Sequence, residues 1–264
     1  MNVASKQPIG IFDSGIGGTS IWKEINQLLP NEKTIYLSDS KNAPYGQKSE
    51  EKILELCIKN TEFLIHKNCK IIVVACNTAT TNAITYLREN YTIPFIGIEP
   101  AIKPASINTT TKSIGILATK GTLNSSLFAK TSTKIDQEVA IIEQVGEGLV
   151  ELIENGQLVS NEMTQLLNSH LQKLLQHNID YLVLGCTHYP YLIPQIKDLI
   201  GKHITIIDSG QAVAKQTRRV LEDNNLLNNQ NVMPTHLFYS NTNTNVLKMV
   251  LGENKNYRIE KINF

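Results

Sequence analysis

Residues 73–78 read VVACNT, and residues 183–188 read VLGCTH. In both stretches an apolar run ends in a cysteine, and polar side chains follow at once. The residues before each cysteine are apolar at consecutive positions, which is typical of a strand buried on both faces of a parallel sheet. We therefore expect Cys76 and Cys186 to lie at the carboxyl ends of two buried strands.

A second pair of matching stretches precedes the two cysteines. Residues 9–12 (IGIF) match residues 114–117 (IGIL), 105 positions further on, while Cys76 and Cys186 are 110 positions apart. Two markers in the same order at nearly one offset indicate two similar units of roughly equal size. Because ligands bind at the carboxyl ends of parallel strands, two facing units would place the two thiols on opposite walls of one cleft.

Strand-like and helix-like stretches alternate along the whole chain. The pattern predicts strands at 8–12, 34–37, 70–75, 113–117, 139–143, 180–184, 204–207 and 237–239. It predicts helices at 19–29, 49–67, 78–89, 122–129, 148–154, 161–176, 191–200, 211–222 and 245–251. Doubly apolar strands that alternate with helices predict an α/β fold with parallel sheets covered by helices.

The composition limits the possible partners. The 264 residues include 25 basic and 24 acidic side chains, so the chain has no overall electrostatic reason to bind nucleic acid or an anionic membrane. The N-terminus lacks the apolar segment of a secretory signal, and apolar runs such as residues 71–75 are far shorter than the ~20 residues that span a bilayer. We expect a cytoplasmic protein with reduced thiols and with neither nucleic-acid nor membrane partners.

Two thiols that face each other across a cleft can act as a base and an acid. One removes a proton from one face of a carbon and the other returns a proton to the opposite face, which inverts the stereocentre without metal or cofactor. A helix N-terminus after each cysteine would lower the thiol pKa and favour the reactive thiolate. The alternatives are two packed structural cysteines, a two-domain protein that binds a small polar ligand without chemistry, and thiol–disulfide exchange.

Polar residues near the two cysteines are candidates for assisting roles. His188 lies two positions after Cys186 and could activate that thiol, or it could simply bond the backbone at a helix start. Asp13 ends the first strand and could assist Cys76 or position a substrate ammonium group, or it could be a turn residue. By its sequence position alone, Glu154 is a solvated helix residue.

Two loops and two further cysteines complete the candidate features. Residues 13–19 (DSGIGGT) form a glycine-rich loop whose amides could hold a carboxylate or phosphate at a helix N-terminus. Nucleotide binding is not expected, because Ser20 replaces the third glycine of GxGxxG and no Walker lysine follows. Residues 44–46 (PYG) indicate a turn that could offer backbone amides to a substrate. Cys57 is expected in the core, and Cys69, which precedes a strand, is expected to be structural. The absence of a CxxC pair argues against a structural zinc site.

Five segments resemble the signature segments of glutamate racemases, in the same order. They are residues 13–18 (DSGIGG), 44–46 (PYG), 75–79 (ACNTA), 116–122 (ILATKGT) and 185–190 (GCTHYP). The resemblance implies two pseudo-symmetric parallel-sheet α/β domains with the active site in the cleft between them. Residues 1–98 and 209–264 would form the first domain, and residues 99–208 the second.

The resemblance also implies roles for single residues. Cys76 and Cys186 would be the acid/base thiols, Asp13 would assist Cys76, and Glu154 and His188 would assist Cys186. The substrate would be bound by Asp13, Ser14, Pro44, Tyr45, Gly46, Asn77, Thr78, Thr119, Thr187 and His188. Many members of the family have a Cys-Pro pair before the helix that carries the assisting glutamate, where this chain has residues 145–148 (VGEG), so Glu151 is an alternative to Glu154.

The reaction implied by the resemblance is the interconversion of L- and D-glutamate without a pyridoxal cofactor or a metal. The D-glutamate would supply peptidoglycan synthesis, and a homodimer is a possible assembly because the family often dimerises. An aspartate racemase or a related amino-acid racemase remains an alternative, because the sequence does not show the depth of the cleft.

Overall fold

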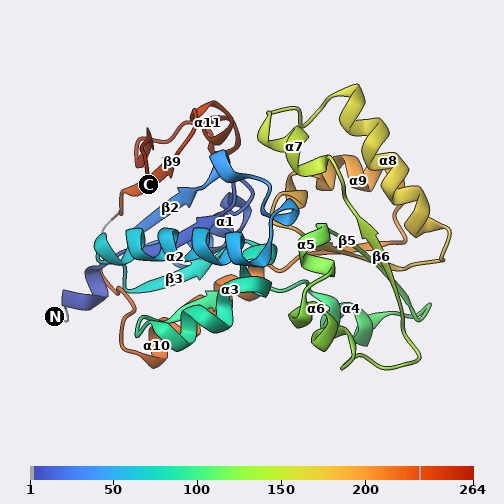
Figure 1. The fold of residues 1–264 in the computed structure, drawn as a ribbon, viewed down its shortest axis with the longest axis horizontal. Helices are drawn as coiled ribbons and strands as arrows, with labels where there is room; N and C mark the ends of the chain where they lie inside the picture. Colours follow the sequence, from blue (N-terminus) through green and yellow to red (C-terminus); the bar gives the residue numbers. More distant parts are fainter. Residues whose placement is uncertain (1–2, 232) are drawn as a thin grey trace.

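The computed structural model describes residues 3–231 and 233–264, which form two sheets lying side by side, each flanked by helices (Figure 1). The first sheet has six strands in the order β10-β9-β2-β1-β3-β4, and the second has four in the order β6-β5-β7-β8. Neighbouring strands in both sheets are parallel. The strands are β1 (Ile9–Asp13), β2 (Thr34–Ser38), β3 (Ile71–Val74), β4 (Phe95–Gly97), β5 (Ser113–Ala118), β6 (Ala140–Val145), β7 (Tyr181–Gly185), β8 (Thr205–Ile207), β9 (His236–Ser240) and β10 (Tyr257–Lys261). The predicted fold of two parallel-sheet α/β domains is confirmed.

The two sheets share one pairing pattern. In the first, β1 pairs with β2 and β3, and β3 pairs with β4. In the second, β5 pairs with β6 and β7, and β7 pairs with β8. Only the first sheet is extended, because β9 pairs with β2 and β10 with β9. Cys76 and Cys186 therefore follow equivalent strands, β3 and β7, in the two halves of the repeat.

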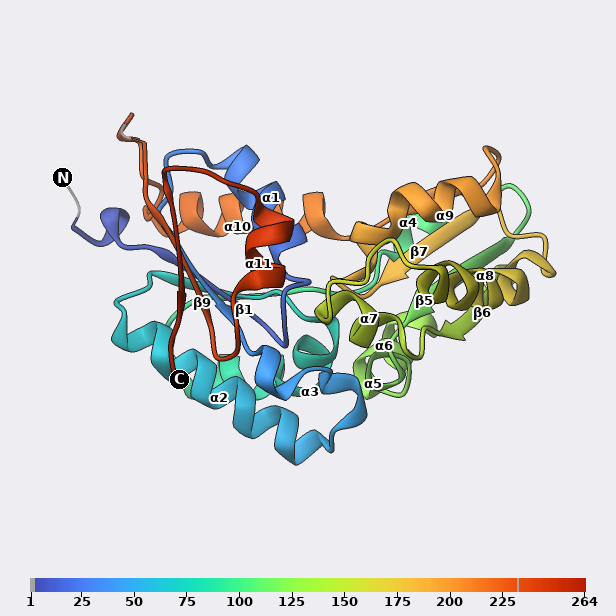
Figure 2. The same cartoon turned by 90° about the horizontal axis from the view of Figure 1, so that it is seen from above.

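Helices cover both faces of the first sheet, with α1 and α10 on one side and α2 and α3 on the other (Figure 2). Ile71 and Val73 of β3 belong to the core on the α1 and α10 side, while Ile72 and Val74 belong to the core on the α2 and α3 side. This two-sided burial is why β3 is apolar at every position.

The described helices follow the strands in alternation. They are α1 (Thr19–Leu28), α2 (Glu50–His66), α3 (Asn77–Asn90), α4 (Ile102–Asn108), α5 (Lys120–Leu123), α6 (Ser126–Ser132), α7 (Leu149–Glu154), α8 (Asn161–Leu175), α9 (Ile193–Ile200), α10 (Gly210–Asp223) and α11 (Asn245–Leu251). Short 3₁₀ helices are η1 (Val3–Lys6), η2 (Ser40–Asn42), η3 (Tyr45–Gln47) and η4 (Tyr189–Leu192). Within the described chain, every helix is too short or too polar to cross a membrane.

Some predicted elements differ from the structure. The single helix predicted at 122–129 is wrong, because two capping side chains divide it into α5 and α6. Thr119 accepts a hydrogen bond from the Thr122 amide to begin α5, and Ser125 accepts one from the Phe128 amide to begin α6. The strands β4 and β10 and the helix α4 were not predicted. β4 has only three residues, and β10 is an edge strand whose side chains are mostly exposed.

The chain crosses between the sheets twice, after β4 and again between β8 and α10. The two crossings lie together, because the Ser209 hydroxyl donates a hydrogen bond to the carbonyl oxygen of Glu99. Domain boundaries at 98/99 and 208/209 would fall on these crossings, and they stay a prediction. Both crossings lead to the region where the carboxyl ends of the strands meet.

Candidate active site

Both predicted thiols line one small cavity. Cys76 follows β3 as the N-cap residue of α3, Cys186 follows β7, and their side chains are buried. The cavity has a volume of about 10 Å³, which is the space that one water molecule needs. Residues from both halves of the repeat line it: Ser14, Pro44, Tyr45, Gly46, Cys76, Asn77, Thr78, Thr119, Thr122, Val150, Gly185, Cys186, Thr187 and His188.

Cys76 lies in a buried polar environment. Its Sγ accepts a hydrogen bond from the Ala79 amide at 3.4 Å, and its thiol donates toward Oγ of Ser14 at 3.8 Å. Burial, followed by the charge of Asp13, raises the pKa of Cys76 well above its usual range and outweighs the favourable Ala79 amide. The expectation that the helix N-terminus lowers this pKa is therefore wrong for Cys76, because burial removes the thiolate from water.

Asp13 lies behind the cavity wall, next to Cys76. Its Oδ2 accepts a hydrogen bond from the Gly18 amide at 2.7 Å and from the Thr187 hydroxyl at 3.4 Å, while Ser14 donates to Oδ1 at 3.4 Å. Burial raises the pKa of Asp13, although the charge of His188 opposes this shift. Asp13 is thus connected to the Cys76 thiol through Ser14. Asp13 does not line the cavity, so the structure does not place it in direct contact with a ligand there.

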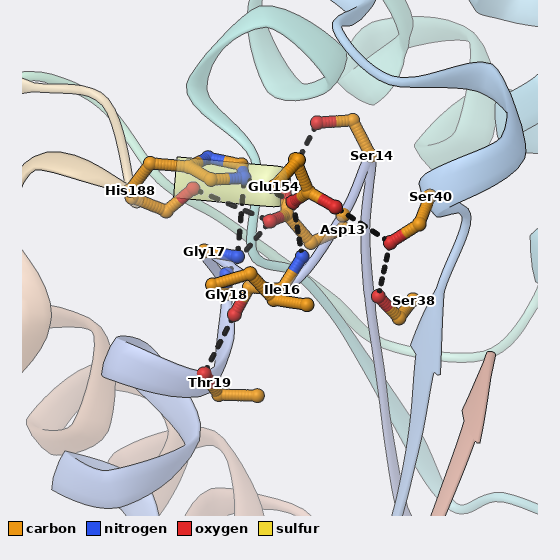
Figure 3. Close-up of polar contacts among 12 residues, drawn as sticks. Asp13, Ser14, Ile16, Gly17, Gly18, Thr19, Ser38, Ser40, Glu154 and His188 are labelled. Atoms are coloured by element: carbon orange, nitrogen blue, oxygen red, sulfur yellow. Dashed lines mark hydrogen bonds and ion pairs between the residues drawn. The ribbon is translucent and has the colours of Figure 1, made fainter. Parts of the chain in front are cut away.

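On the other side of the cavity, Cys186, His188 and Glu154 form a chain of polar contacts. Sγ of Cys186 lies 3.7 Å from Nδ1 of His188. Nε2 of the same histidine lies 2.6 Å from Oε1 of Glu154 (Figure 3). Glu151, the alternative considered from the sequence, instead accepts a hydrogen bond from Nε2 of Gln47 at 2.5 Å. The structure therefore brings Glu154, and not Glu151, against His188.

The pKa shifts of His188 and Glu154 both favour the charged forms of the two side chains. Burial lowers the pKa of His188, but the contacts with Cys186 and Glu154 outweigh it and raise that pKa well above its usual range. Burial likewise raises the pKa of Glu154, but hydrogen bonds from His188, the Ile16 amide and Ser40 outweigh it and lower that pKa. Both shifts therefore favour an imidazolium–carboxylate pair beside the Cys186 sulfur.

The glycine-rich loop binds side chains of the protein itself. The Ile16 amide donates to Oε1 of Glu154 at 2.6 Å, and the Gly17 nitrogen lies 3.3 Å from Nε2 of His188 (Figure 3). A Cβ atom on Gly17 would lie 2.3 Å from Nδ1 of His188, so this close approach requires glycine. The sequence indicated that the loop could hold a ligand carboxylate, but at Ile16 the carboxylate is that of Glu154.

The loop that carries Pro44, Tyr45 and Gly46 forms another part of the wall. The Tyr45 hydroxyl donates to Oδ2 of Asp39 at 2.5 Å and accepts a hydrogen bond from the Asn60 amide at 3.2 Å. The tyrosine hydroxyl is thus engaged within the protein, which leaves the backbone of the loop to contact a ligand.

Hydroxyl and amide groups cluster on the remaining wall. Oγ1 of Thr78 lies 2.8 Å from that of Thr119 and 3.3 Å from that of Thr122. The side-chain nitrogen of Asn77 is buried and has no hydrogen-bond partner among the described residues. An unsatisfied buried donor is costly, so this NH₂ group is suited to receive an acceptor such as a ligand carboxylate.

Most of the predicted site residues meet at the cavity, and two lie behind it. Asp13 stands behind Ser14, and Glu154 stands behind His188. The sequence did not single out Thr122, although it lies in a recognised segment, residues 116–122. It also missed Ser40, whose hydroxyl donates to Oε2 of Glu154 at 2.7 Å, because no motif marks that position.

The other two cysteines lie outside the cavity. Cys57 is buried, as predicted, in the core on the α2 side of the first sheet. Cys69 is buried in the same core, and both are free thiols. Burial raises the pKa of Cys69 to about 12. Across residues 3–231 and 233–264, no group of His, Cys, Asp and Glu is arranged to hold a metal ion.

A larger hollow adjoins the cavity. It has a volume of about 230 Å³ and shares four lining residues with the cavity: Pro44, Gly46, Thr119 and Val150. Gln47, Lys120 and Glu151 contribute polar side chains to its wall. The two spaces together extend from the thiols toward the surface between the domains.

Comparison with known proteins identifies the family. Residues 9–217 match the Asp/Glu/Hydantoin racemase family. A glutamate racemase of Ectopseudomonas mendocina is 44% identical over 94% of this chain and 96% of its own.

Solved structures agree with this match. The crystal structure of a glutamate racemase isoform of Bacillus anthracis has a TM-score of 0.88 and 31% identity, covering 98% of each chain. That of Escherichia coli glutamate racemase with L-glutamate and the activator UDP-MurNAc-ala has a TM-score of 0.84 and 32% identity, covering 97% of this chain and 98% of its own. As the resemblance in its sequence predicted, this chain belongs to the Asp/Glu/Hydantoin racemase family.

Proposed function

We propose that this chain is a glutamate racemase that interconverts L- and D-glutamate by direct proton transfer between two thiols, without a pyridoxal cofactor. The observation that carries the proposal is the placement of Cys76 and Cys186. They follow equivalent strands of two different sheets, and both line one small cavity. A base and an acid on different walls of one site are what inversion of a carbon requires.

The proton balance of the reaction is simple. The thiolate of one cysteine takes the α-hydrogen of glutamate, and the thiol of the other gives its proton to the opposite face of the planar carbanion. One C–H bond breaks and one forms, and the two cysteines exchange protonation states. Asp13, connected through Ser14, would exchange the proton of Cys76. His188, held by Glu154, would do so for Cys186 and would stabilise negative charge on its sulfur.

The same cavity offers groups for the substrate carboxylates. We assign the unpaired amide of Asn77, the hydroxyls of Thr78, Thr119 and Thr187, and the backbone of the loop at Gly46 to this task. Donors around the α-carboxylate would also stabilise the carbanion, in a site from which water is excluded. Since the cavity holds about one water molecule, the domains must separate for glutamate to enter through the adjoining hollow.

The proposed setting follows from this chemistry. Reduced thiols are required, which favours the cytoplasm. The D-glutamate produced would supply peptidoglycan synthesis. Assembly into a homodimer stays a prediction.

The test is to incubate the purified protein with L-glutamate in deuterated water without added cofactor. We expect D-glutamate that carries deuterium at the α-carbon, and loss of racemisation in Cys76→Ala and Cys186→Ala. Cys69→Ala is the matched control, because Cys69 is a buried cysteine outside the cavity, and it should retain activity.

Each other outcome has a definite meaning. Faster racemisation of L-aspartate would keep the two-thiol chemistry and change the substrate. Full racemisation activity in either Cys76→Ala or Cys186→Ala would contradict the two-thiol mechanism. Binding of glutamate with no isotope exchange would favour a protein that binds without chemistry.

A further inference from the structure

Glu154 connects the two domains as well as contacting His188. It ends α7, which belongs to the second half of the chain, yet two of its partners belong to the first. The Ile16 amide donates to Oε1 at 2.6 Å, and the Ser40 hydroxyl donates to Oε2 at 2.7 Å (Figure 3). The Glu154 carboxylate is therefore held by both domains when they are closed.

Ser40 is itself held in a defined position. It follows β2 as the first residue of η2, and its hydroxyl lies 2.9 Å from that of Ser38 (Figure 3). The adjacent Asp39 is buried and accepts hydrogen bonds from the side chains of Asn42 and Asn241. Asn241 in turn accepts a hydrogen bond from the Lys41 amide at 2.9 Å. Asn241, which follows β9, thus holds the turn that carries Ser40 in place.

The two oxygens of the Glu154 carboxylate have different partners, and these partners together fix the orientation of the carboxylate. Oε1 lies 2.6 Å from both the Ile16 nitrogen and Nε2 of His188. Without a partner for Oε2, the carboxylate could rotate about its terminal bond and lose the alignment of Oε1 with the imidazole. The Ser40 hydroxyl removes that freedom with a hydrogen bond to a charged acceptor, which is among the stronger kinds.

We propose that Ser40 is a positioning residue for the reaction, acting through Glu154 and His188 on Cys186, and that it does so only when the two domains are closed. Domain closure would thereby complete the acid/base group of the second domain with a hydroxyl from the first. This inference rests on the proposed racemase function.

The test compares single and double variants in the glutamate racemisation assay. We expect Ser40→Ala to lower kcat about tenfold with KM changed less than about twofold, because substrate contacts remain while the relay loses alignment. Ser40→Thr keeps the hydroxyl and should restore most of the activity. In a Glu154→Gln background, Ser40→Ala should have almost no further effect, because its action passes through that carboxylate.

The matched control is Tyr191→Phe. It removes another hydrogen bond between the two halves of the chain, the one between the hydroxyls of Tyr191 in η4 and Thr19 in α1, outside the cavity, and it should leave kcat nearly unchanged. The melting temperature of each variant shows whether it folds.

Several results would overturn the inference. They are an unchanged kcat in Ser40→Ala, an equal loss in Tyr191→Phe, or full additivity of the Ser40 and Glu154 changes. A wild-type protein that does not racemise glutamate would instead contradict the proposed function, so the two failures are distinguishable.

Discussion

The pair of His188 and Glu154 is expected to contribute to stability as well as to the proposed proton transfer. Although burial opposes both shifts, contacts with Cys186 and Glu154 raise the pKa of His188, and hydrogen bonds from His188, the Ile16 amide and Ser40 lower the pKa of Glu154, so both shifts favour the charged forms. Removing one member of such a pair leaves the other charge in a poorly solvated place, which typically costs about 3 kcal/mol of unfolding free energy. The pair that we propose to assist Cys186 is therefore also expected to stabilise the fold.

The pH dependence of this contribution follows from the two shifts. Glu154 has a lowered pKa in the folded protein, so its contribution is present above the ordinary value of 4.5 and is lost as the pH falls through the folded pKa. His188 has a raised pKa, so its contribution is complete below the ordinary value of 6.5 and is lost as the pH rises through the folded pKa. We expect the stability difference between wild type and Glu154→Gln to be largest between these two ordinary values.

Urea unfolding of the two proteins at a series of pH values measures that difference. A difference that is flat across the whole range would show that the pair is not charged in the folded protein. The exposed pair of Arg218 and Glu222 provides a control, because Glu222→Gln should change the unfolding free energy by less than about 0.5 kcal/mol at any pH.

At the scale of elements, the loop between β2 and α2 forms a wall of the cavity, and buried side chains hold it in place. Tyr45 is the centre of this support, through Asp39 on one side and Asn60 on the other. The network fixes the backbone of Pro44 and Gly46 against the second domain. The position of this part of the cavity wall therefore depends on the Tyr45 hydroxyl, which is hydrogen-bonded within the protein.

Tyr45→Phe should weaken both the fold and substrate binding. Loss of the hydroxyl leaves the buried Asp39 carboxylate without one donor, which we expect to lower the unfolding free energy by about 2 kcal/mol. The looser loop should raise KM about tenfold with a smaller change in kcat. Urea unfolding and steady-state kinetics measure the two effects. The exposed Tyr86 provides the matched control, and equal behaviour of Tyr45→Phe and Tyr86→Phe would contradict the supporting role of the network.

At the scale of the whole molecule, the site exists only where two domains meet. Ser14, Asn77 and Thr78 come from one half of the repeat, while Thr119 and Thr187 come from the other. Each half supplies one thiol. A ligand that contacts both walls must therefore favour the closed arrangement over the open one.

Glutamate is thus expected to stabilise both domains together. At 100 times its Kd it should raise the unfolding free energy by about 2.7 kcal/mol. When glutamate is added, hydrogen exchange should slow both in α7 of the second domain and in residues 40–46 of the first. The edge strand β10, distant from the cavity in the first sheet, should change least. Protection limited to one domain would contradict a substrate site shared by both.

Local patterns in the sequence were sufficient for much of the fold. Strands β1, β3, β5 and β7 were predictable because burial on both faces requires apolar residues at consecutive positions. The repeat was visible in the sequence because equivalent strands of the two sheets are buried in the same way and therefore carry similar apolar residues. The break between α5 and α6 was not predicted, since the caps at Thr119 and Ser125 compete with helix propensity over only a few residues. The edge strand β10 was also missed. Tyr257 and Ile259 pack partly buried against the core and alternate with exposed residues, but two apolar positions in a five-residue strand are a weak signal.

By itself, the sequence determined the α/β class, the two-unit repeat and the position of each thiol at a strand end, because these depend on residues close together in the chain. Only the tertiary structure decided that Glu154 rather than Glu151 meets His188, that Asp13 lies behind the wall, and that Ser40 holds Glu154. Ser40 and Glu154 are separated by 114 positions. Such a contact depends on how two domains dock, and no local periodicity or turn pattern encodes that docking.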